Sequence, residues 1–255
     1  MKEFLKEFYI IFRIRSAEFR DFIFGNKEYT KFLIISDSRT GSTLLQNMLN
    51  FHPKIIAKGE LFKVIENKES SEVWNSIFRK YQKSIKYVGF KLFYHHPLKG
   101  DPGVWDIAKK DPSIIIIHLV RKNTLRSLIS KKIGAKTRKW TENINADPIS
   151  IDDKKVTIDP LECEEYFIKI NDYQNKIDQD FKHHRIISVT YEDLSYDRRD
   201  VIDNIYSKLE LNKFNRDSEL KKQNPESLKD LVVNFKELTE YFEGTKWEQY
   251  FQDEE

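Results

Sequence analysis

Four short apolar segments alternate along the chain with longer segments of helical spacing. They predict strands at residues 32–36, 87–93, 114–120 and 185–190. The four consecutive isoleucines at 114–117 are typical of a strand that is covered on both faces. Helices are expected between the strands, at residues 42–50, 71–83, 104–110, 123–134 and 160–181. This alternation predicts an α/β fold of three layers, with a central parallel β-sheet flanked by helices and right-handed crossovers.

The length of 255 residues favours a single domain that covers residues 1–255. Within it we expect a helical extension at residues 1–30 and a polar loop over the active site at residues 138–159. No stretch has the ~20 apolar residues of a membrane span, and the single cysteine, Cys163, excludes an intrachain disulfide. We therefore expect a cytoplasmic protein.

Aromatic and basic residues are mixed in the first 24 positions. Such a helix can pack on the core, join a homo-oligomer or lie on an anionic membrane. The sequence leaves open a homo-oligomer and a peripheral contact of residues 1–24 with the inner membrane face. The net charge of only +3 argues against a nucleic-acid partner.

The first strand leads into small polar residues and then a helix, an arrangement that suits a phosphate or sulfate. The spacing from Ser36 to Thr43 follows the P-loop pattern, but Ser42 occupies the lysine position. Loss of that lysine disfavours a nucleoside triphosphate with magnesium. Backbone amides, hydroxyl groups and Arg39 can still hold a less charged phosphate–sulfate group.

A second basic segment follows the strand at residues 114–120. Eight Lys or Arg residues and no Asp or Glu lie between Arg121 and Lys139. The segment is either a solvated helix face or part of a site for a compact polyanion. Arg126 is expected to be an exposed helix charge.

These segments resemble a known family. The octet from Ser38 to Leu45 is similar to the 5′-phosphosulfate loop of sulfotransferases that use 3′-phosphoadenosine 5′-phosphosulfate, especially the bacterial carbohydrate and lipid branch. The segment 119–130 resembles the 3′-phosphate motif of that family, in which a basic residue at a strand end works with a serine on the next helix. Tyr191-Glu192-Asp193 and the tail around residues 222–225 are also similar.

The resemblance implies a P-loop-like fold and transfer of a sulfuryl group to an acceptor hydroxyl on a glycan, lipid or small alcohol. The product would be 3′-phosphoadenosine 5′-phosphate, and the scheme needs no metal. The residues expected to bind the donor are Arg39, Thr40, Gly41, Ser42, Thr43, Leu44, Arg121 or Lys122, Ser130, Tyr191, Lys222 and Gln223.

Related enzymes place a glutamate base shortly after the first helix, and Glu60 has that position. His95 and His96 are the competing bases, because cytosolic members use a histidine after a strand that carries a lysine, here Lys91. Arg39 and Lys91 are the expected cations at the reacting group. Two other classes stay open: a P-loop small-molecule kinase, and a non-catalytic module that binds adenosine phosphates or sulfated glycans.

Overall fold

The protein is built on a parallel sheet of five strands. A computed structural model describes residues 16, 18–140, 149–218, 220 and 222–252. The strand order is β2-β3-β1-β4-β5, and every neighbouring pair is parallel. The strands are β1 (Thr30–Ser36), β2 (Ile55–Lys58), β3 (Tyr87–Phe93), β4 (Ile115–Val120) and β5 (Ile186–Thr190). The predicted fold class is confirmed, and β2 is an additional edge strand.

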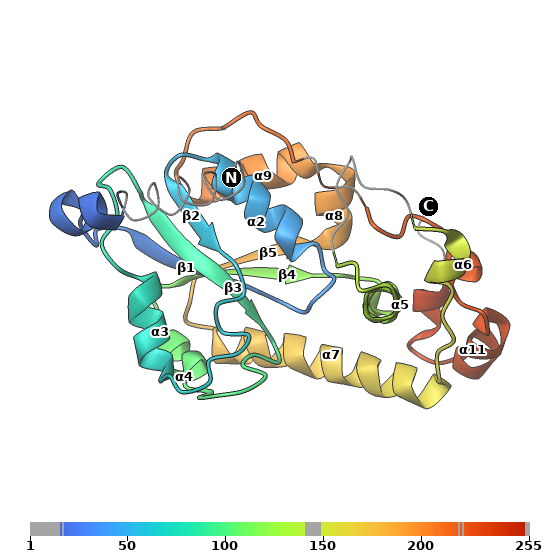
Figure 1. Ribbon diagram of the computed structural model, residues 1–255. Helices are drawn as coiled ribbons and strands as arrows, with labels where there is room; N and C mark the ends of the chain where they lie inside the picture. Colours follow the sequence, from blue (N-terminus) through green and yellow to red (C-terminus); the bar gives the residue numbers. More distant parts are fainter. Residues whose placement is uncertain (1–15, 17, 141–148, 219, 221, 253–255) are drawn as a thin grey trace, which may run out of the picture.

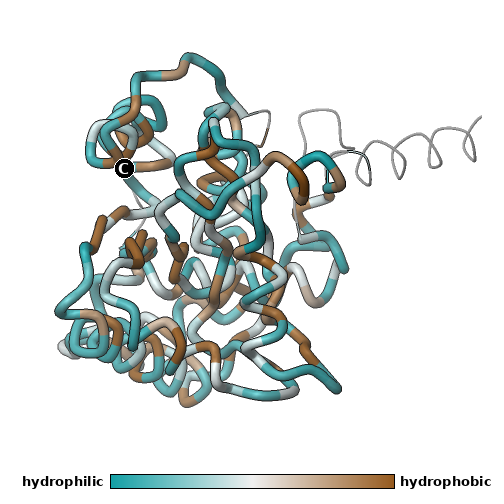
Figure 2. Tube along the Cα trace, turned by 90° about the vertical axis from the view of Figure 1, so that its left-hand side faces the viewer, coloured by the Kyte–Doolittle hydropathy of each residue, from teal (hydrophilic) through white to brown (hydrophobic). Residues whose placement is uncertain are grey.

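Helices cover both faces of this sheet, as Figure 1 shows. One layer contains α2 (Ser42–Phe51), α8 (Tyr191–Tyr196) and α9 (Arg198–Lys208). The opposite layer contains α3 (Ser70–Ile77), α4 (Val104–Lys110) and α7 (Pro160–Asp180). Hydrophilic and hydrophobic residues alternate along the outer helices (Figure 2), as expected for helices with one face on the sheet.

A third group of helices lies beyond the carboxyl ends of the central strands (Figure 1). It comprises α5 (Thr124–Thr137), α6 (Ile151–Lys154), α10 (Leu228–Leu231), α11 (Phe235–Phe242) and the 3₁₀ helix η1 (Glu248–Phe251). Leu125, Ile129 and Phe167 join this group to α7 in a separate apolar cluster. Packed helices therefore cover the edge of the parallel sheet at which the strands end, where sheets of this kind bind their ligands.

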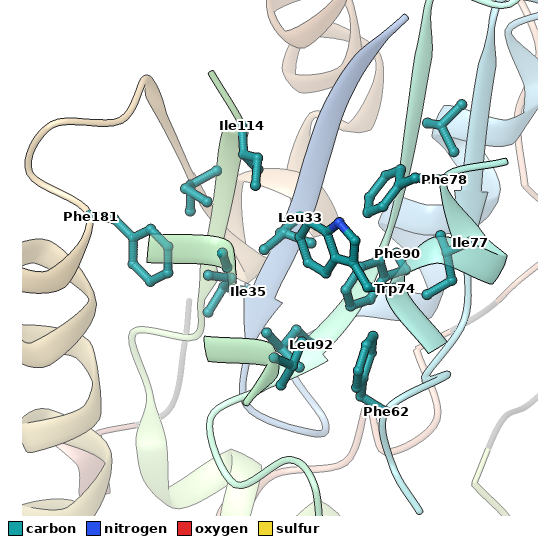
Figure 3. Close-up of a cluster of buried hydrophobic side chains, with 14 of the residues drawn as sticks. Leu33, Ile35, Phe62, Trp74, Ile77, Phe78, Phe90, Leu92, Ile114 and Phe181 are labelled. Carbon is teal, nitrogen blue, oxygen red and sulfur yellow. The ribbon is translucent and has the colours of Figure 1, made fainter. Parts of the chain in front are cut away.

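The side chains of β1 alternate between the two main apolar clusters. Leu33 and Ile35 pack on the α3 side, with Trp74 and Phe90 among their neighbours (Figure 3). Phe32 and Ile34 join the opposite cluster, which packs against α2 and α9. Because both faces of the strand are buried, its sequence is a continuous apolar run.

Two segments differ from the sequence prediction. The helix predicted at residues 71–83 ends at Ile77, because Phe78 leaves the helical region and Tyr81 forms a backbone bridge to Asn26. The predicted loop at residues 138–159, of which residues 141–148 lie outside the described residues, contains α6 and a bridge between Val156 and Val232. Ser150 caps α6 by accepting from the N–H of Asp153, which explains why a helix begins in this polar segment.

The predicted N-terminal extension is only partly described. Residues 18–24 are helical, whereas residues 25–29 connect to β1 without helix. The predictions for residues 1–15 lie outside the described residues. Across the part of the chain that the structure describes, no helix has both the length and the apolar character needed to cross a membrane.

Gly89 lies where β3 packs closely against Phe32 of β1. A Cβ atom at this position would lie 2.2 Å from the carbonyl oxygen of Phe32 and 2.6 Å from its ring. We predict that Gly89→Ala lowers the free energy of unfolding by about 1–3 kcal/mol, measured by urea denaturation. Gly59→Ala is the matched control, since nothing lies within 4 Å of its Cβ position. Equal stability of the two variants would contradict this packing.

Candidate active site

The loop between β1 and α2 has a backbone that requires glycine. Gly41 precedes α2 with φ 81°, and a Cβ atom there would lie 2.8 Å from the Tyr191 ring. Gly41 has no side chain to cap the helix, so the first N–H groups of α2 remain available to an anion. Arg39, two residues earlier, also has a positive φ of 68°. The loop is thus shaped for backbone recognition of an anion.

A pocket opens at this loop and is bounded by residues far apart in the sequence. It is lined by Arg39, Gly41, Ser42, Thr43, Leu44, Arg121, Arg126, Ile129, Ser130, Trp140, Tyr191, Ser195, Arg198, Leu220, Lys222, Gln223, Asn224, Leu228 and Leu231. The loop before α2, helices α5 and α8, and the segment before α10 therefore meet around one cavity. Ten of the predicted donor-binding residues lie in its wall, namely Arg39, Gly41, Ser42, Thr43, Leu44, Arg121, Ser130, Tyr191, Lys222 and Gln223.

Two predicted donor-binding residues lie outside this wall. Thr40 is buried, and its hydroxyl group donates to the carbonyl oxygen of Asp37 at 2.8 Å. Lys122 is exposed, and its amino group lies 3.8 Å from a carboxylate oxygen of Asp193. Of the two alternative cations at the end of β4, only Arg121 lines the pocket.

Arg39 reaches across the pocket instead of remaining at its own loop. Its Nε donates to the Ser130 hydroxyl at 2.9 Å, and its two terminal nitrogens donate to the Trp140 carbonyl and the Gln223 side chain. Burial and then the nearby charge of Arg121 lower the pKa of Arg39. An anion in the pocket would offset both effects.

Arg121 is held by the wall of the same pocket. Its guanidinium lies 4.3 Å from the centre of the Tyr191 ring, and Nη1 donates to the Arg39 carbonyl at 3.3 Å. The ring of Tyr191 therefore contacts both Gly41 and Arg121. This packing joins the Tyr-Glu-Asp segment to the loop before α2 and to the end of β4.

The prediction that Arg126 is an exposed charge is wrong. Arg126 is only 6% exposed, and its Nη1 donates to the Glu226 carbonyl at 3.0 Å. It lines the pocket because it lies four residues before Ser130, on the same face of α5. That spacing was a usable signal in the sequence. Arg198, Ser195 and Trp140 also line the pocket, and no motif in the sequence indicated them.

Glu60 and Lys91 form an ion pair next to the anion loop. The Glu60 carboxylate lies 3.3 Å from the Lys91 amino group, which donates to the Thr43 hydroxyl at 3.1 Å. Burial lowers the pKa of Lys91, whereas the Glu60 carboxylate acts in the opposite direction. Two predicted catalytic residues thus adjoin a predicted donor-binding residue.

The two histidines have different surroundings. His95 is partly exposed, and its Nδ1 lies 3.6 Å from a carboxylate oxygen of Asp37. His96 is buried, and its Nδ1 accepts from the N–H of Phe93 at 3.2 Å. Burial, followed by the charges of His95, Lys63 and Lys91, lowers the pKa of His96 to about 3. His96 is therefore neutral at physiological pH.

The described part of the chain contains no group of three or more His, Cys, Asp or Glu residues arranged to hold a metal ion.

Comparisons with known proteins agree with this architecture. No protein-family model matches the chain. The sulfotransferase from Alicyclobacillus acidocaldarius has a similar structure, with a TM-score of 0.52 and 15% identity over 83% of this chain and 90% of that chain. This chain therefore shares the fold of that sulfotransferase, a helix-flanked parallel sheet, along most of both chains.

The sequence is also similar to two curated relatives along most of its length. Nodulation protein H of Rhizobium tropici is 25% identical over 239 residues, which cover 87% of this chain and 92% of the relative. Nodulation protein H of Rhizobium meliloti (strain 1021) is 26% identical over 238 residues, with 87% and 94% covered. The similarity therefore extends well beyond the anion-binding loop.

His96 gives a testable pH dependence. A histidine in the unfolded chain takes up its proton near pH 6.5, whereas the buried ring does so near pH 3. Between these values the unfolded state binds more protons, so stability falls as the pH falls. We predict that His96→Asn flattens this part of the pH–stability curve, measured by urea denaturation from pH 7 to 4. The exposed His183→Asn is the control, and an unchanged slope in His96→Asn would contradict the assignment.

Proposed function

We propose that this protein is a sulfotransferase that uses 3′-phosphoadenosine 5′-phosphosulfate. It transfers a sulfuryl group to the hydroxyl group of a glycan, lipid or small alcohol and leaves 3′-phosphoadenosine 5′-phosphate. The observation that carries this proposal is the single pocket walled by both anion-binding motifs, with the Glu60–Lys91 pair at the Thr43 end. Each part has a role that this reaction needs.

The pocket offers two separate groups of anion ligands. Ser42, Thr43 and the N–H groups at the start of α2 suit the 5′-phosphosulfate end. Arg121 and Ser130, on the β4–α5 side, suit the 3′-phosphate. Arg39 spans both groups through its bond to Ser130, so it can bind either phosphate.

The nucleoside would lie between these two groups. Tyr191 and Leu44 supply aromatic and apolar surface in the same wall, and we assign them to the adenine. Lys222 and Gln223 close the wall from the segment before α10.

Glu60 is the proposed general base. In the reaction the acceptor oxygen bonds to sulfur, the bond from sulfur to the leaving phosphate oxygen breaks, and Glu60 takes the hydroxyl proton. Lys91 contacts both Glu60 and Thr43, so it holds the base beside the donor loop and can stabilise the negative charge that develops there. His95 is the alternative base, but its ion-pair contact is with Asp37 and not with Lys91 or Thr43.

We further propose a cytoplasmic location and one domain for residues 1–255. The single cysteine, Cys163, is buried, which suits a reducing compartment. Residues 1–24 are the segment proposed to contact the inner membrane face or a second copy of the chain.

The role of Glu60 is tested by Glu60→Gln. We predict that sulfuryl transfer falls by about 10²–10⁴-fold because the amide cannot take the proton, whereas the affinity for 3′-phosphoadenosine 5′-phosphate changes by less than about threefold. Transfer is measured by the mass gain of sulfate in a panel of hydroxyl compounds, and binding by calorimetry. The control is Glu66→Gln, an exposed carboxylate on the same segment that pairs with Lys99. Transfer that survives in Glu60→Gln but disappears in His95→Asn would move the role to His95.

The 3′-phosphate assignment is tested by Arg121→Ala and Ser130→Ala. Because a hydrogen bond to a charged group contributes about 1.5–3 kcal/mol, each change should weaken the binding of 3′-phosphoadenosine 5′-phosphate by about 10–100-fold. Adenosine 5′-phosphate, which lacks the 3′-phosphate, should be affected much less. Lys122→Ala removes the neighbouring exposed cation and should leave both affinities unchanged. An undiminished preference for the 3′-phosphorylated nucleotide in the first two variants would defeat the assignment.

A further inference from the structure

Asp37 is a buried carboxylate directly between β1 and the anion loop. Its side chain is only 4% exposed. One carboxylate oxygen accepts from the Lys131 amino group and from the Tyr166 hydroxyl, each at 2.6 Å. The other oxygen lies 3.6 Å from Nδ1 of His95. Asp37 therefore joins the loop to α5, α7 and the end of β3.

Two adjacent side-chain contacts connect the loop after β1 to α5. Asp37 and Arg39 are two residues apart in the loop, while Ser130 and Lys131 are consecutive on α5. Asp37 pairs with Lys131, and Arg39 pairs with Ser130 at 2.9 Å. These two bonds connect the proposed 5′-phosphosulfate loop to the helix that carries the proposed 3′-phosphate ligand.

The two connections differ in their relation to the pocket. Arg39 and Ser130 both lie in the pocket wall, so a bound phosphate would compete for their hydrogen bond. Asp37 and Lys131 lie outside that wall, and Asp37 instead borders a small separate cavity together with Tyr166. The Asp37–Lys131 bond can therefore persist while the donor is bound.

The surroundings of Asp37 suit a permanent charged contact. Burial alone would raise the pKa of this carboxyl group, but hydrogen bonds from His95, Lys131 and Tyr166 and the charge of Lys131 lower it to about 2. Lys131 is itself placed over the Tyr166 ring, 4.6 Å from its centre. The Thr40 hydroxyl donates to the backbone carbonyl of Asp37 and so ties the Asp37 backbone to the turn of the loop.

We propose that Asp37 is a positioning residue that, through Lys131, fixes the spacing between the anion loop and Ser130 and so makes the site selective for donors with a 3′-phosphate. The inference rests on the proposed function. Asp37 touches neither the donor nor the acceptor in this scheme. Its effect is the alignment of two ligand groups that must bind one molecule at the same time.

The test compares two nucleotides on the full chain by calorimetry. We expect Asp37→Asn and Lys131→Met each to weaken the binding of 3′-phosphoadenosine 5′-phosphate by about 10–100-fold. The affinity for adenosine 5′-phosphate should change by less than about threefold. The double variant should lose no more of the preference than the more affected single variant, because the Asp37–Lys131 ion pair is already absent in each single variant. Lys131→Arg keeps the charge and should retain most of the preference. Lys131 is partly exposed, so Lys131→Met decides the question if Asp37→Asn does not fold.

Lys132→Met is the matched control. Lys132 follows Lys131 on α5, but it pairs with Glu162 near the surface. Its loss should leave both affinities unchanged. A wild-type protein without preference for the 3′-phosphorylated nucleotide would overturn the proposed function itself. Suppose that the wild-type protein has that preference. The role of Asp37 would then be overturned if Lys131→Met lost affinity equally for both nucleotides, or if it kept the wild-type preference.

Discussion

The gathering of arginines around one pocket is the constraint on which the proposed site depends. Burial and then the nearby charge of Arg121 lower the pKa of Arg39. Arg126 and Arg198 line the same pocket. Arg198 pairs with the Asp217 carboxylate, whereas Arg39, Arg121 and Arg126 contact neutral groups, namely carbonyl groups, the Gln223 side chain and the face of Tyr191. We propose that a ligand with two anionic ends neutralises Arg39 and Arg121, as a nucleotide with phosphates on both sides of the ribose would.

The parallel sheet produces this concentration of charge. Because β1 and β4 are neighbours with the same direction, the segments that follow them emerge side by side at one edge. One segment supplies the glycine turn and the start of α2, and the other supplies Arg121 and Ser130. In the proposed site, guanidinium and hydroxyl groups take the place of the P-loop lysine, whose position Ser42 occupies. The absence of that lysine is the argument against a kinase that binds a triphosphate with magnesium.

Some of this arrangement could be predicted from the sequence because it follows from local patterns. The continuous apolar runs of β1 and β4 predict strands buried on both faces, and the loop with Gly41 predicts the start of α2. Other features depend on contacts distant in the sequence. The choice between Arg121 and Lys122 depends on the direction in which each side chain leaves the end of β4, and the burial of Arg126 depends on the segment around Glu226. The bond from Arg39 to Ser130 likewise needs the loop and α5 to be placed together.

We propose that the pocket binds a 3′-phosphorylated adenosine nucleotide rather than a nucleoside triphosphate. Calorimetric titration of the wild-type chain with 3′-phosphoadenosine 5′-phosphate, and separately with ATP plus magnesium, compares the two ligands. We expect the first nucleotide to bind at least about tenfold more tightly, a difference of about 1.4 kcal/mol. Tighter binding of ATP with magnesium would show that the pocket is instead that of a kinase.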